Sequence, residues 1–129
     1  MTTTHNILLI DDDPDIHSAV RMILEPEGYK VHCSLTGAEG LSMARRARPS
    51  VILLDVMLTS PSEGFHLAYE MKRDEALAGV PIIILSAIGQ TMGMDYAKEL
   101  GTDYLPANAF VEKPFDATTL REAVRNVLK

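Results

Sequence analysis

The polar residues that could do chemistry follow directly after short apolar runs in this 129-residue chain. In an open parallel sheet, ligands bind at the carboxyl ends of the strands. If the apolar runs are strands, we expect the residues that follow them to meet at one edge of the sheet. They are Asp11, Asp12 and Asp13 after residues 7–10, Asp55 after 51–54, Ser86 after 81–85, and Lys113 with Pro114 after 109–112.

Several carboxylates at one place repel one another unless a cation lies among them. Carboxylate oxygens without neighbouring His or Cys suit a hard ion, and Mg²⁺ prefers one or two carboxylates together with waters and a phosphate oxygen. An Asp carboxylate can also attack phosphorus to form an aspartyl phosphate. Ser86 and Lys113 would then offer a hydrogen bond and a positive charge to the phosphoryl oxygens.

The elements that must position these residues are indicated by the hydrophobic pattern. Continuous apolar runs are typical of buried parallel strands, and segments with helical spacing lie between them. The resulting alternation predicts an α/β, doubly wound parallel sheet with five strands and five helices. The predicted strands are 7–10, 29–34, 51–54, 81–85 and 109–112, and the predicted helices are 14–27, 36–46, 63–75, 91–100 and 116–128.

Local signals mark several of the expected helix ends. Pro14 suits the first turn of the first helix, and Gly28 suits its stop. The hydroxyl of Thr36 and the carboxylate of Glu39 have the spacing of a capping box.

Composition limits the function classes. The net charge of -6 argues against a nucleic-acid-binding surface, and no apolar run approaches the ~20 residues of a membrane span. We therefore expect a cytoplasmic protein. The length of 129 residues fits one compact domain, so we expect a single domain over residues 1–129 and no effector domain. The one cysteine, Cys33, is expected to be a small buried residue. The histidines show no ligand spacing and are expected to be structural or exposed: His5, His17, His32 and His66.

The ordered set of site residues resembles the receiver domain of two-component response regulators over essentially the whole chain. The family pattern is an acidic pair, a phospho-accepting Asp, a Ser or Thr before a small residue, and Lys-Pro, each after its own strand. The matching residues are Asp11 with Asp12, Asp55, Ser86 with Ala87, and Lys113 with Pro114. The resemblance implies a flavodoxin-like sheet with strand order 2-1-3-4-5.

The resemblance also implies roles for these residues. Asp55 would be the phosphoacceptor, and Ser86 and Lys113 would contact the phosphoryl group. Mg²⁺ would be bound by Asp12, Asp55 and the backbone carbonyl of Met57, with Asp11 acting through water. Ser86 and Phe110 would move together as the switch.

The implied partners are a sensor histidine kinase or phosphotransfer protein and a downstream protein. No nucleic acid or membrane is expected as a direct partner. A homodimer would use the face of the fourth helix, fifth strand and fifth helix.

The chain departs from the family pattern in two loops. Between Asp55 and Gly64 it holds an extra residue, with Thr59 where Pro is usual. Before Lys113 it is longer by the stretch 103–108, and Phe110 keeps the family's spacing to the lysine although Tyr104 is a second match for the switch aromatic.

Two other functions fit parts of the pattern. A haloacid-dehalogenase-type phosphatase would use Asp11, Asp13, Ser86 and Lys113, but Asp15 stands where that family has Thr or Val and Asp55 has no role in it. A pseudo-receiver would keep the fold as a docking module without phosphorylation. Phosphorylation by acetyl phosphate with Mg²⁺ distinguishes the three readings.

Overall fold

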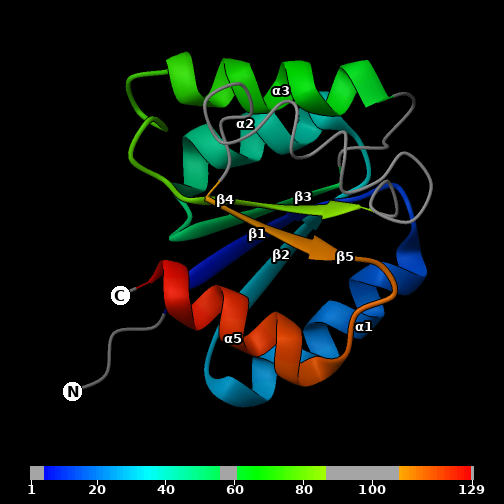
Figure 1. Ribbon diagram of the computed structural model, residues 1–129. Helices are drawn as coiled ribbons and strands as arrows, with labels where there is room; N and C mark the ends of the chain where they lie inside the picture. The colour runs from blue at the N-terminus through cyan, green and yellow to red at the C-terminus, as the bar shows by residue number, and fades with distance from the viewer. Residues whose placement is uncertain (1–4, 56–60, 87–107, 129) are drawn as a thin grey trace.

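The computed structural model describes residues 5–55, 61–86 and 108–128, with the backbone alone for 61–65 and 86. These residues form a five-stranded parallel sheet in the order β2-β1-β3-β4-β5, which confirms the predicted sheet (Figure 1). The strands are β1 (Asn6–Ile10), β2 (Lys30–Ser34), β3 (Val51–Asp55), β4 (Ile82–Ser86) and β5 (Ala109–Glu112).

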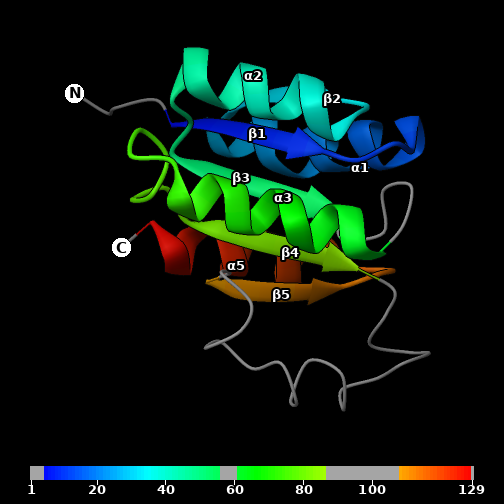
Figure 2. The same cartoon turned by 90° about the horizontal axis from the view of Figure 1, so that it is seen from above.

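Helices cover both faces of this sheet, with α1 and α5 on one face and α2 and α3 on the other (Figures 1 and 2). The helix predicted at 91–100 lies outside the described residues. The third helix begins earlier than predicted, because Pro61 suits the first turn of a helix. The helices are α1 (Pro14–Leu24), α2 (Gly37–Ala47), α3 (Pro61–Arg73) and α5 (Ala117–Val127), and a 3₁₀ turn at Glu25–Glu27 follows α1.

Alternate residues of each strand enter two separate cores, one on each face of the sheet. In β1, Leu8 and Ile10 pack with the α2 and α3 face, whereas Ile7 and Leu9 pack with the α1 and α5 face. Because side chains alternate along a strand, a continuous apolar run supplies both layers at once. The apolar residues of the central strands, 7–10, 51–54 and 82–85, are therefore buried, and the polar residues that follow them mark the sheet's carboxyl edge.

Hydrogen bonds at this edge confirm the predicted starts of α1 and α2, whereas α1 ends at Leu24, earlier than the predicted stop, and a 3₁₀ turn continues to Gly28. The side chain of Asp13 caps α1 by accepting from the Asp15 amide at 2.9 Å. Thr36 Oγ1 caps α2 by accepting from the Glu39 amide at 3.1 Å. Gly28, at φ 96°, ends the turn that follows α1 in a conformation that glycine adopts without strain.

Cys33 is half-buried, which corrects the prediction of a buried thiol. It lies on β2, an edge strand of the sheet, and so is covered by fewer neighbours than a residue of a central strand. Partial burial raises the pKa of the Cys33 thiol, and the charge of Arg21 opposes that rise.

Within the described part of the chain, each helix is too short or too polar to cross a membrane.

Candidate functional site

Three carboxylates meet where β1 and β3 end. Each of Asp11, Asp12 and Asp55 offers an oxygen, and these atoms all lie within 4.8 Å of one another. Asp11 is 0% exposed and Asp55 is 4% exposed, whereas Asp12 faces solvent. The convergence predicted from the order of strands is confirmed.

Lys113 brings a positive charge to this cluster from the end of β5. Its Nζ donates to Asp11 Oδ2 at 2.8 Å and lies 3.6 Å from Asp55 Oδ2. The Lys113 side chain is only 18% exposed, so the attraction is less screened by water than in a surface pair. One lysine thus offsets part of the charge of the three carboxylates.

Asp11 is held by a hydrogen bond at each of its polar atoms. Its amide donates to the Ser34 carbonyl at 3.0 Å, and its Oδ1 accepts from the Asp13 amide at 2.9 Å. Its Oδ2 accepts from Lys113, and its backbone carbonyl accepts from His17 Nε2 at 2.7 Å. Asp11 is therefore a fixed part of the frame, while the neighbouring Asp12 presents its carboxylate to solvent.

The donor set fits a hard divalent cation. It consists of three carboxylates, with no His or Cys ligand in the group. Oxygen donors of this kind suit Mg²⁺, whereas zinc sites are built mostly from Cys and His. Two of the carboxylates are buried, and burying charge is costly unless it is offset. A cation among them would supply the charge that Lys113 alone does not.

The other predicted site residues are only partly described. The backbone of Ser86 ends β4 at the same edge, in register with Glu112. Phe110 lies on β5 opposite Ile84 and is 45% exposed. Met57 lies outside the described residues, as do Thr59, Tyr104 and the rest of the stretch 103–107. Asp13 caps α1 and is not a member of the carboxylate group.

Asn108, the last residue of the inserted stretch, ties the start of β5 to β4. Its amide donates to the Ile82 carbonyl at 2.7 Å, and its Oδ1 accepts from the Ile82 amide at 2.9 Å. Lys72 Nζ donates to the Val80 carbonyl at 3.1 Å and to Asn108 Oδ1 at 3.4 Å. Partial burial lowers the pKa of Lys72. This anchor fixes where the strand that carries Phe110 begins.

His17 is the residue at the site that the sequence did not reveal. It was expected to be structural or exposed, yet its Nε2 contacts the Asp11 backbone. Helical side chains tilt toward the N-terminus of their helix, so a residue in the first turns of α1 can reach the chain before it. That placement, read with the acidic pair ahead of the helix, is the signal that could have pointed to His17.

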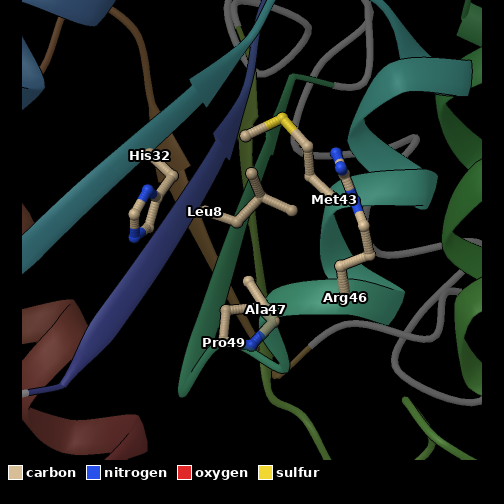
Figure 3. Close-up of a pocket in the computed structure, with 6 residues that line it drawn as sticks. All are labelled: Leu8, His32, Met43, Arg46, Ala47 and Pro49. Carbon is tan, nitrogen blue, oxygen red and sulfur yellow. The ribbon is translucent and has the colours of Figure 1, made fainter.

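Figure 3 shows an open, mostly apolar pocket of about 220 Å³, whose lining includes no member of the acidic group. Its walls come from β1, β2, α2 and the segment after α2, and none of the predicted site residues contributes to them. The lining residues are Leu8, His32, Met43, Arg46, Ala47 and Pro49.

Comparison with known sequences agrees with this geometry. The sequence profile of the response regulator receiver domain matches residues 7–125. The DNA-binding dual master transcriptional regulator RpaA of Synechocystis is 35% identical over 95% of this chain and 48% of its own length. The transcriptional regulatory protein CseB of Streptomyces coelicolor is 35% identical over 100% of this chain and 51% of its own length. The chain spans about half the length of these curated relatives.

Solved structures of receiver domains have the same fold as this chain. The receiver domain of the sensor histidine kinase PA1611 of Pseudomonas aeruginosa, with magnesium coordinated in its active-site cleft, has a TM-score of 0.82 at 25% identity. That match covers 98% of both chains. The chemotaxis response regulator CheY4 of Vibrio cholerae has a TM-score of 0.81 at 27% identity, over 98% of this chain and 100% of CheY4.

Proposed function

Because this chain belongs to the response regulator receiver domain family, we propose that Asp55 is the residue that accepts the phosphoryl group. As a receiver domain, the chain is a phosphoacceptor of two-component signalling rather than an enzyme with substrate turnover, and a histidine kinase partner is implied. The observation that carries the proposal is the position of Asp55 at the end of buried β3, with its Oδ2 3.6 Å from Lys113 Nζ and its carboxylate in the acidic group.

Magnesium is the cofactor that this donor set favours. We assign Asp12 and Asp55 as direct ligands together with the Met57 carbonyl, and Asp11 as a residue that acts through water. Both carboxylate oxygens of Asp11 already accept hydrogen bonds, which supports its indirect role through water. Asp12 is exposed, which supports its role as a direct ligand. When bound, Mg²⁺ would offset the charge of the carboxylates and of the incoming phosphoryl group.

The chain's own residues would prepare Asp55 and respond to its modification. Lys113 would hold a phosphoryl oxygen by a charge-assisted bond, and the hydroxyl of Ser86 would hold another. Phe110 would then change its exposure and alter the surface near β5, which is where a downstream protein would bind. A homodimer through the face formed by the fourth helix, β5 and α5 remains a proposal of the same kind.

The haloacid-dehalogenase-type alternative needs Asp11 as the nucleophile. Both of its carboxylate oxygens already accept hydrogen bonds, one from the Asp13 amide and one from Lys113 Nζ. That environment suits a positioning role and not an attack on phosphorus. The pseudo-receiver alternative has no use for the three carboxylates and the lysine that converge here.

Intact-mass measurement after incubation with acetyl phosphate and Mg²⁺ tests the proposal. The parent should gain a single phosphoryl group, and the matched variant Asp55→Asn should gain none. Labelling of Asp55→Asn to the parent's extent would remove Asp55 as the acceptor. Loss of labelling in Asp11→Asn, with turnover of a general phosphate ester by the parent, would favour the phosphatase instead.

We also propose that residues 1–129 form a single receiver domain. The two cores share one sheet, which supports a single cooperative unit. Unfolding transitions that coincide in circular dichroism and tyrosine fluorescence would agree with this, whereas separate transitions would contradict it.

A further inference from the structure

His17 makes a contact that no role described so far explains. Its Nε2 lies 2.7 Å from the backbone carbonyl oxygen of Asp11, which can only accept a hydrogen bond. The hydrogen must therefore be on Nε2, so the imidazole is either the Nε2–H tautomer or the imidazolium. The bond holds in both states, and its role does not depend on the charge of the ring.

The bonded carbonyl belongs to the peptide group that joins Asp11 to Asp12. Because a peptide group is planar, holding its oxygen restricts the rotation of the whole plane and therefore the direction in which Asp12 leaves it. On the other side, the Asp11 amide and carboxylate are already tied to Ser34, Asp13 and Lys113. His17 supplies the remaining restraint next to the exposed ligand.

We propose that His17 is a positioning residue of the metal site, whose Nε2–H fixes the peptide plane that aims the Asp12 carboxylate at the cation. This inference rests on the proposed function, because it assumes that Asp12 binds Mg²⁺. His17 itself touches neither the metal nor the phosphoryl group. It acts as groups behind metal ligands do, by reducing the reorganisation that binding requires.

A matched pair of substitutions separates this role from simple packing. In His17→Gln, the amide Nε2 stands as many bonds from the backbone as the imidazole Nε2 and can donate the same hydrogen bond. The Met side chain in His17→Met resembles that of Gln in length and in helix propensity, but it has no hydrogen-bond donor. We expect the Mg²⁺ affinity of His17→Met, measured by calorimetric titration, to fall about tenfold. This is the lower end of the loss that is typical when a residue that hydrogen-bonds a metal ligand is replaced. The Gln variant should keep most of the parent's affinity.

A second measurement uses the parent protein without metal. Nitrogen-15 NMR of the His17 ring distinguishes the two neutral tautomers, and we expect the proton on Nε2. A ring protonated only on Nδ1 would overturn the proposal, because the Asp11 carbonyl would then have no donor. Because this measurement uses only the parent protein, it tests the proposal even if His17→Met fails to fold.

The outcomes also distinguish this inference from the proposed function. Equal Mg²⁺ affinity in the parent and a folded His17→Met, or equal weakening in both His17 variants, would refute the positioning role. In either case Asp12→Ala would still bind Mg²⁺ poorly and Asp55 would still be labelled. If the parent binds no Mg²⁺, or if Asp12→Ala binds it as tightly as the parent, the assignment of the metal ligands itself fails, and the His17 inference fails with it.

Discussion

Replacing Lys113 by Met removes the cation that faces two buried carboxylates. Lys113 Nζ lies 2.8 Å from Asp11 Oδ2 and 3.6 Å from Asp55 Oδ2, and Met keeps much of its length without the charge. In the absence of Mg²⁺, the variant should leave the Asp11 carboxylate, which is 0% exposed, without its positive partner. The free energy of unfolding should therefore fall.

The size of the loss follows from the burial of the pair. Removing one partner of a buried ion pair costs about 3–5 kcal/mol. The Lys113 side chain is 18% exposed, and Asp11 Oδ1 keeps its bond from the Asp13 amide, so we expect a value near the lower end, about 3 kcal/mol. Neutralising both partners in Asp11→Asn/Lys113→Met should recover part of this loss, because the fully buried Asp11 charge is then removed while the Asp55 carboxylate remains.

Urea unfolding followed by far-ultraviolet circular dichroism measures the change, which suits a chain without tryptophan. The midpoint should fall at an unchanged slope. Saturating Mg²⁺ should stabilise Lys113→Met more than the parent, since the ion replaces part of the missing charge. A single variant as stable as the parent in metal-free buffer, or a double variant no better than the single one, would refute this account of the pair.

The remaining predictions concern packing and pH. A Cβ added at Gly40 would lie 2.5 Å from Ile10 Cδ1 and 2.6 Å from Ile10 Cγ1, so Gly40→Ala should lower stability by about 1–2 kcal/mol despite its better helix propensity. Gly79→Ala, where a Cβ meets nothing within 4 Å, is the control, and equal thermal midpoints for the two variants would contradict the clash. The Arg45 hydrogen bond to Asp74 at 2.8 Å lowers the pKa of that carboxyl, so its stabilising effect is present at neutral pH and is lost as pH falls through the lowered pKa. Asp74→Asn should therefore show a shallower loss of stability on acidification than the parent, and parallel acid profiles would show that this pair does not contribute.

The sequence by itself determined the sheet and the identity of the main site residues. The runs that became β1, β3 and β4 are continuously apolar because both faces of a central parallel strand are covered, and this requirement is visible in the residues alone. Asp11, Asp12 and Asp55 could be grouped for the same reason, since ends of parallel strands meet at one edge whatever the loops between them do.

Tertiary structure alone decided how these residues are used. That Lys113 lies closer to Asp11 than to Asp55 depends on the exit of β5, which is set by residues distant in sequence. The contact of His17 with the Asp11 carbonyl depends on the rotation of α1 about its axis. Cys33 is only half-buried because the strand order makes β2 an edge strand. Each of these outcomes depends on how segments distant in the sequence pack together. The hydrophobic pattern of a helix or strand indicates which of its faces is buried, but it does not indicate which side chains that face contacts.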